Sequence, residues 1–244
     1  TLAGYYRYGD QLAAVCKWVH GISVRDYLNA VEKRRRPAFS SFKASQLFRK
    51  FAHGLCQLHS IKAVAHGDIK PENVILTSKP HQLVLVDFGS AWVLEQMARR
   101  DRGDGESPLY AAPEVLNGGR LTFASDQFSA SMVYYEMLTN RMPYDPIGGQ
   151  AGNAPAGTLP AAILKPPSEI APLAEKTPQR VWQIIDEIAL RGLEFEPSER
   201  FRTSKEWRDH LDHLNSEMRT EHELAEENKI LVRLIDAASR LFRK

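Results

Sequence analysis

The chain has 244 residues and a mass of 27.6 kDa, which allows one large domain or two small ones. Hydrophobic residues make up 43% and charged residues 25%, which is typical of a folded protein and argues against a wholly disordered or collagen-like chain. The 32 Lys and Arg residues nearly balance the 30 Asp and Glu residues, so the net charge of +2 gives no general reason to bind nucleic acid or an anionic membrane.

The sequence also predicts where the protein works. No run of about 18 apolar residues is present, so we expect no membrane span. The only two cysteines, Cys16 and Cys56, lie among apolar neighbours. This predicts buried thiols in a reducing compartment, and we expect a cytoplasmic protein.

The apolar pattern predicts an α+β protein that is mostly α, because helices dominate from residue 23 onward and the few strands are short and joined by turns. In chain order we expect two extended segments within 2–19, a helix over 24–32 capped by Ser23, an amphipathic helix over 45–59, short strands at 73–76 and 83–86 joined by a turn, a buried helix over 126–138, a short helix at 159–164, a helix around 181–188, and helices over 204–214 and 216–244.

The most informative stretch is the loop His66-Gly67-Asp68-Ile69-Lys70-Pro71-Glu72-Asn73. Asp68 and Asn73 are five positions apart with Lys70 between them, so this loop presents a carboxylate, an amine and an amide. Such a loop could orient a hydroxyl, neutralise a phosphate and bind a metal. Asp87, at the end of the second short strand, adds another carboxylate, and hard oxygen ligands of this kind suit Mg²⁺ together with the phosphates of a nucleotide.

These residues resemble the catalytic loop and the metal-binding turn, here Asp87-Phe88-Gly89, of the eukaryotic-type protein kinase family. Three later segments agree in order and spacing. Residues 107–114 are similar to the end of a kinase activation segment, Ser125-Asp126 to the start of the central helix, and 197–201 to the segment whose arginine pairs with the activation-segment glutamate. The resemblance covers residues 2 to about 214 and implies a kinase large lobe with a remnant of the small-lobe sheet.

The resemblance implies a role for each matching position. Asp68 would accept or orient the proton of the substrate hydroxyl, and Lys70 would stabilise the transferring phosphoryl group. Asn73 and Asp87 would hold Mg²⁺, with ATP as the phosphoryl donor. Lys70 two residues after Asp68 is the pattern of serine/threonine kinases rather than tyrosine kinases.

Two further groups of positions follow from the same resemblance. For the nucleotide, Cys16 would be the gatekeeper, Lys17 and Val19 would offer hinge backbone groups to the adenine, and Ile75 would form the floor beneath it. In the activation segment, Ser107 would contact the catalytic loop, and Glu114 would form a buried ion pair with Arg200.

The sequence departs from the family pattern in ways that weaken regulation by phosphorylation. Gly67 stands where the family template has an arginine, and residues 97–106 contain no Ser, Thr or Tyr. This combination looks more like bacterial members of the family than animal ones. The expected activity is transfer of the ATP γ-phosphoryl group to Ser or Thr of a protein substrate. An inactive kinase-like scaffold is the alternative, and a small-molecule kinase is a third reading that Glu114 and Arg200 argue against.

No Gly-rich G-x-G-x-x-G precedes Asp68, and Lys17 is only 51 residues before it, too close to be the ATP-binding lysine. We therefore expect a small-lobe remnant at 1–22, the large lobe at 23–214 and a C-terminal amphipathic helix at 215–244. The chain would then be a fragment, a truncated inactive module, or a lobe completed by a partner chain. We expect the 244 residues alone to turn over ATP poorly.

The last 29 residues carry an apolar stripe with segregated charge. Acidic residues dominate the first half of 216–244 and basic residues the second half, which complements the helix dipole. The stripe must be covered by the large lobe of the same chain, by a second copy in a short coiled coil, or by an anionic membrane. Its members are Leu224, Leu231, Ile235, Ala238 and Phe242.

Overall fold

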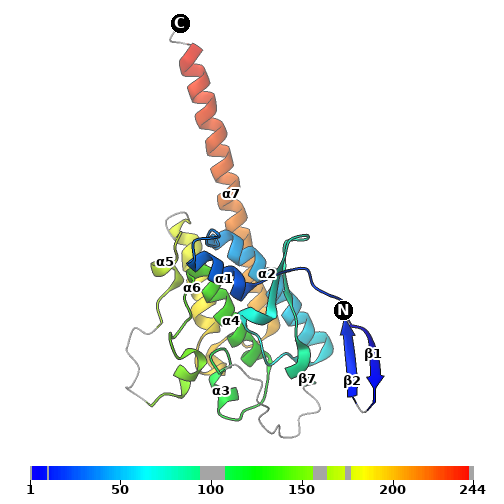
Figure 1. Ribbon diagram of the computed structural model, residues 1–244. Coiled ribbons are helices and arrows are strands. Elements are labelled where there is room, and N and C mark those ends of the chain that lie inside the picture. Colours follow the sequence, from blue (N-terminus) through cyan, green and yellow to red (C-terminus); the bar gives the residue numbers. More distant parts are fainter. Residues whose placement is uncertain (1, 10, 94–107, 156–163, 174–176, 242–244) are drawn as a thin grey trace.

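The computed structural model describes residues 2–9, 11–93, 108–155, 164–173 and 177–241. Figure 1 shows a helical body, a β-hairpin standing to one side near the N-terminus, and a long C-terminal helix that projects from the body. The predicted α+β, mostly α, class is confirmed. The predicted helix at 159–164 lies almost wholly outside the described residues, as do Ser107 and Phe242.

The strands in the described residues form three small antiparallel sheets. The pairs are β1 (Leu2–Tyr8) with β2 (Gln11–Cys16), β3 (Gly21–Ser23) with β5 (Val74–Thr77), β5 with β6 (Leu83–Leu85), and β4 (Val64–Ala65) with β7 (Trp92–Val93). The two extended segments expected within 2–19 therefore pair with each other, and the turn expected between residues 76 and 83 joins β5 to β6. Gly21 begins β3, where a Cβ atom would lie 2.4 Å from the Leu76 carbonyl oxygen.

Helices make up most of the body. The described helices are α1 (Val24–Glu32), α2 (Ser41–Lys62), α3 (Pro113–Leu116), α4 (Phe123–Thr139), α5 (Pro167–Ile170), α6 (Gln179–Gly192) and α7 (Ser204–Leu241), with short 3₁₀ turns η1 (Pro71–Asn73), η2 (Phe88–Ser90), η4 (Gly148–Asn153) and η6 (Pro197–Glu199). None of the helices in these residues is long and apolar enough to span a membrane.

Local signals explain where the two helices nearest the site begin. Ser23 caps α1, and its hydroxyl accepts a hydrogen bond from the Asp26 amide at 3.0 Å, as the sequence predicts. Thr122 and Ser125 form a reciprocal capping box at the start of α4. These caps fix the positions at which both helices enter the body.

Helix α4 lies at the centre of the fold. It is buried along almost its whole length, as expected for a helix that is apolar on most sides. One apolar cluster packs α4 against α2, α6 and α7, and a second surrounds it on the side of Tyr110 and Tyr144. The Phe48 and Tyr134 rings stack at 4.1 Å between their centres, joining α2 to α4.

Two expectations about the chain differ from the structure. The helices expected at 204–214 and 216–244 form one continuous helix, α7, because the sequence between 204 and 241 contains no Gly or Pro to interrupt it. Burial of both thiols is wrong for Cys16, which is exposed, whereas Cys56 is buried; both thiols are free.

Candidate functional site

The loop of residues 66–73 lies between β4 and β5, beside the end of β6. The Val86 amide donates a hydrogen bond of 2.9 Å to the Asn73 carbonyl, which fixes the end of the loop next to the end of that strand. Asp87, the residue after Val86, adopts a left-handed conformation with φ of 62°, which aspartate tolerates better than most residues. The β5–β6 hairpin therefore brings two predicted site segments, separated by fourteen positions, to one edge.

Asp68 is the most constrained carboxylate of the loop. Its side chain is 9% exposed, and the ammonium nitrogen of Lys70 lies 2.8 Å from Oδ2. The Asn73 amide donates to the same Oδ2 at 2.9 Å and to the Asp68 carbonyl at 2.9 Å. Both side-chain contacts use Oδ2, so Oδ1 is the oxygen that can receive a proton from another molecule. The structure thus brings together Asp68, Lys70 and Asn73.

The donor set at the edge of the loop fits a hard divalent cation. Both described hydrogen bonds of the Asn73 side chain use its nitrogen, which directs the amide oxygen away from Asp68 as a possible ligand. Asp87 is exposed, and its Oδ1 accepts a long hydrogen bond of 3.3 Å from the Gly89 amide. An amide oxygen and a carboxylate are the kind of ligands that Mg²⁺ uses alongside phosphate oxygens and water. In the described residues, no group of three or more His, Cys, Asp or Glu side chains could hold a metal by itself.

A carboxylate from the central helix anchors the start of the loop. Asp126, 1% exposed in the first turn of α4, accepts hydrogen bonds from the amides of His66 at 2.7 Å and Gly67 at 2.9 Å. A third bond joins it to the ring of His59 in α2 at 2.9 Å. The family resemblance indicated Asp126 only as part of the start of a helix, so its role as the anchor of this loop is a finding of the structure.

The backbone conformation at position 67 explains why a glycine stands where the family pattern has an arginine. Its φ of +78° lies in the left-handed region that favours glycine. A Cβ atom here would also lie 2.6 Å from a methyl group of Leu121. The loop conformation that exposes its amide to Asp126 therefore needs a glycine at position 67.

His66 is a buried, hydrogen-bonded residue that supports the loop. Its Nδ1 accepts from the Asp68 amide at 3.3 Å, and Nε2 donates to the Val86 carbonyl at 3.2 Å. Burial lowers the pKa of His66, against the opposite influence of the carboxylates of Asp126, Asp68 and Asp87. The neutral ring therefore links the loop to the residues that lead from β6 to Asp87.

Replacing Asp126 with asparagine should loosen the loop. The substituted amide would direct its own N–H groups towards backbone N–H donors, and each buried donor left without a partner costs about 1–3 kcal/mol. We expect a lower free energy of unfolding, measured by denaturant titration. The matched control is Asp209→Asn, which alters an exposed carboxylate of α7 and should change stability by less than about 0.5 kcal/mol. Equal stability of the two variants would contradict the anchoring role.

The predicted nucleotide positions lie on different elements and differ in exposure. Cys16 ends β2, and Lys17 and Trp18 follow it on the surface, whereas Val19 is half-buried. Ile75 lies half-buried in β5, opposite Ser23 of β3. The hinge residues and the candidate floor are thus linked through the β3–β5 pair.

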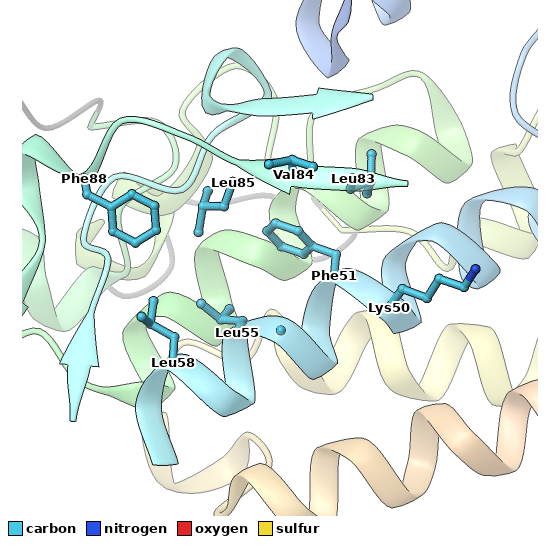
Figure 2. A pocket seen from close by; sticks show the side chains of 9 residues that line it. Lys50, Phe51, Leu55, Leu58, Leu83, Val84, Leu85 and Phe88 are labelled. Carbon is cyan, nitrogen blue, oxygen red and sulfur yellow. The ribbon is translucent and has the colours of Figure 1, made fainter. Parts of the chain in front are cut away.

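A separate apolar pocket of about 290 Å³ opens between α2 and β6. Figure 2 shows Phe51, Leu55 and Leu58 of α2 facing Leu85 and Phe88, the last of which is 49% exposed. None of the four predicted nucleotide residues lines this pocket. It is therefore distinct from the expected adenine position, although Phe88 directly follows Asp87.

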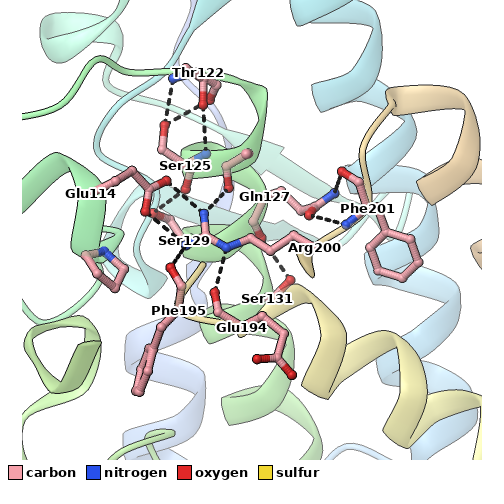
Figure 3. A network of polar contacts seen from close by, with 12 residues as sticks. Glu114, Thr122, Ser125, Gln127, Ser129, Ser131, Glu194, Phe195, Arg200 and Phe201 are labelled. Carbon is pink, nitrogen blue, oxygen red and sulfur yellow. Dashed lines mark hydrogen bonds and ion pairs between the residues drawn. The ribbon is translucent and has the colours of Figure 1, made fainter. Parts of the chain in front are cut away.

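The predicted ion pair between Glu114 and Arg200 is present. Two guanidinium nitrogens of Arg200 bind the two carboxylate oxygens of Glu114 at 2.8 and 2.9 Å. The remaining donors bind the carbonyl oxygens of Ala124, Glu194 and Phe195 at 2.7–2.9 Å, so all five N–H groups have partners. Figure 3 shows Arg200 at the centre of this network, between Glu114 and the start of α4.

A second network, which the sequence analysis missed, joins the loop to α1. Arg25 contacts Glu72 of the loop at 2.8 Å and the buried Glu136 of α4 at 3.0 Å, and it also binds the hydroxyl of Tyr110. Tyr110 in turn donates to Glu136. Burial raises the pKa of Glu136, although Arg25 and Tyr110 act in the opposite direction. The four residues are far apart in sequence, so no local pattern could have indicated them.

Comparison with known proteins identifies similar chains. The family described as "Protein kinase domain" matches residues 1–235. A "Mitogen-activated protein kinase kinase kinase 7" of Drosophila melanogaster is 31% identical over 187 residues, which cover 76% of this chain and 26% of that protein.

Bacterial proteins are similar to a comparable degree. A "Serine/threonine-protein kinase pkn2" of Myxococcus xanthus is 29% identical over 213 residues, covering 83% of this chain and 23% of the relative. A "Probable serine/threonine-protein kinase pknA2" of Bifidobacterium longum is 30% identical over 132 residues, covering 54% of this chain and 16% of the relative. The matched part of this chain thus spans about a quarter or less of the length of these relatives.

Proposed function

This chain belongs to the protein kinase domain family, and we propose that it transfers the γ-phosphoryl group of ATP to serine or threonine hydroxyls of a protein. The observation that supports this most directly is the arrangement of Asp68. Lys70 and Asn73 both bind its Oδ2, which leaves Oδ1 for the proton of an acceptor hydroxyl. The relatives named as serine/threonine kinases support the class of acceptor.

In this proposal the loop supplies positioning and charge. Asp68 orients the acceptor hydroxyl and receives its proton. A carboxylate within hydrogen-bonding reach can hold the hydroxyl in the orientation needed for attack and can accept its proton as the new bond forms. Lys70 is held by Asp68 at 2.8 Å, from where its ammonium group can balance the negative charge of the phosphoryl group in transfer. The two side chains thus act as one unit.

Asn73 and Asp87 are the residues we propose for holding Mg²⁺. When bound, the cation would neutralise negative charge on the phosphate oxygens of ATP. The amide orientation of Asn73 and the exposure of Asp87 fit this role. For the nucleotide base we propose backbone groups of Lys17 and Val19, with Cys16 and Ile75 beside it.

The Glu114–Arg200 pair has a proposed role in forming the substrate-binding face. Arg200 is 0% exposed and ties the segment after residue 107 to the start of α4. The same helix start carries Asp126, which holds the loop with Asp68. The acceptor-binding segment and the loop would therefore share one rigid support.

We propose protein substrates as partners of this activity, a cytoplasmic location, and self-association through residues 216–244. The alternative function is an inactive kinase-like scaffold.

The test is a phosphoryl-transfer assay on this chain and on the complete product of its gene. Each is incubated with Mg-ATP and dephosphorylated casein, and the phosphoamino acids are identified. We expect phosphoserine or phosphothreonine, and complete loss of transfer when EDTA removes Mg²⁺. Absence of transfer from a full-length product that still binds ATP would instead favour the scaffold.

A further inference from the structure

Helix α7 has an anchored half and a projecting half. In the anchored half, Trp207, Leu211, Leu214 and Met218 are at most 2% exposed in the core. Asp212 binds Arg49 of α2 at 2.5 Å. The last of these buried residues is Met218, so the body holds the helix firmly up to that position.

Beyond Met218 the helix leaves the body. Leu224 is 49% exposed, and the backbone remains helical to Leu241. At 1.5 Å per residue, the 23 residues after Met218 extend about 35 Å. Figure 1 shows this half pointing away from the body, with no other described element beside it. This arrangement argues against the large lobe of the same chain as the cover for the apolar stripe.

The stripe has the spacing of a coiled-coil seam. In a heptad register, Leu224 and Leu231 occupy d positions, Asn228 and Ile235 occupy a positions, and Ala238 occupies the next d position. Such a seam is stable when another helix covers it, because most of the stability of a helix in a protein comes from packing of its apolar face. A single polar residue at an a position, here Asn228, is a feature that restricts how partner helices align.

Charge complementarity identifies the partner and its direction. Residues 216–227 contain five acids and one base, a net charge of −4, whereas residues 228–244 contain five bases and one acid, a net charge of +4. A parallel pair of these helices would place like charges side by side. An antiparallel pair would place the acidic half of each helix along the basic half of the other.

We propose that the projecting half of α7 pairs with the same segment of a second copy in an antiparallel coiled coil. With Leu231 near the centre of the pair, the two bodies lie at opposite ends of the coiled coil and do not collide. This deepens the self-association proposed above and does not depend on phosphoryl transfer.

Sedimentation velocity of the full chain over a range of concentrations tests the pairing. We expect a dimer that becomes a monomer when Leu231 and Ile235 are both replaced by serine. The matched control, Glu226→Ser with Arg233→Ser, changes two f positions by one charge of each sign and should remain a dimer. Thermal unfolding checks that the body is intact in both variants.

Three outcomes would overturn the proposal. These are a wild-type chain that stays monomeric at all concentrations, a dimer that survives the Leu231 and Ile235 replacements, and a monomer that binds phosphatidylserine vesicles through the segment. None of these readouts uses enzymatic activity, so failure here leaves the proposed kinase function untouched, and failure of the kinase assay leaves this proposal untouched.

Spin labels determine the direction of the pair. In a Cys16→Ser background, single labels at Glu223→Cys and Ser239→Cys each lie eight residues from Leu231. An antiparallel pair separates two identical labels by about 24 Å along the axis, whereas a parallel pair places them level. Burial raises the pKa of Cys56 to about 11, which keeps that native thiol unreactive during labelling. If the two identical labels lie at the same height along the axis in both labelled dimers, the antiparallel arrangement is wrong.

Discussion

Replacing Asp68 with asparagine is expected to lower the rate of phosphoryl transfer by about 10²- to 10⁴-fold, the usual contribution of a positioned general base. The asparagine side chain has nearly the same size and can still accept a hydrogen bond from Lys70 or Asn73. It cannot take a proton from the acceptor hydroxyl. The effect should therefore fall on kcat, with little change in the apparent affinity for ATP.

The measurement is steady-state transfer to a protein substrate, together with ATP binding by calorimetry. Asp145→Asn makes the same chemical change at an exposed carboxylate outside the loop and should keep the wild-type rate. Thermal unfolding of both variants separates a chemical defect from a loss of structure. Wild-type transfer by a folded Asp68→Asn protein would remove Asp68 from the proposed mechanism.

The parts of the site that the sequence predicts are those encoded over short distances. The loop from His66 to Asn73 is eight residues long, so the spacing of Asp68, Lys70 and Asn73 already determines which groups share one turn. The hairpin of β5 and β6 is equally local, and it brings Asp87 to the same edge. Helix α4 was predictable from its apolar composition, although it begins at Phe123, three residues before the predicted start at 126.

The supporting contacts were not predictable in the same way. Asp126 lies about 60 positions from the loop amides that it binds, and Arg25 is 111 positions from Glu136. Such pairs are set by how the helices pack, for which no periodicity in the sequence gives a signal. The short elements α3 and β4, of four and two residues, were missed because they are too short to show a period and no turn signal joins them to a neighbouring strand.

The second large expected effect concerns Arg200 and stability. Arg200→Met should lower the free energy of unfolding by about 3 kcal/mol, the lower end of the usual result of breaking a buried pair from one side, because Arg200 is fully buried but the Glu114 side chain is 22% exposed. The substitution leaves the Glu114 carboxylate without its counter-charge. It also leaves the carbonyl oxygens of residues 124, 194 and 195 without the hydrogen bonds that Arg200 donates. For a chain of this size, the melting temperature should fall on the order of 10 °C.

The control for this prediction is Arg202→Met, two residues away. This arginine is exposed, so the free energy of unfolding should change by no more than about 0.5 kcal/mol. Glu114→Gln tests the pair from the other side, because it leaves a guanidinium that is 0% exposed without its counter-charge. Since both changes break the same contact, their combination should cost less than the sum of the two. Strict additivity, or an unchanged melting temperature for Arg200→Met, would show that the network around α4 does not support this part of the fold.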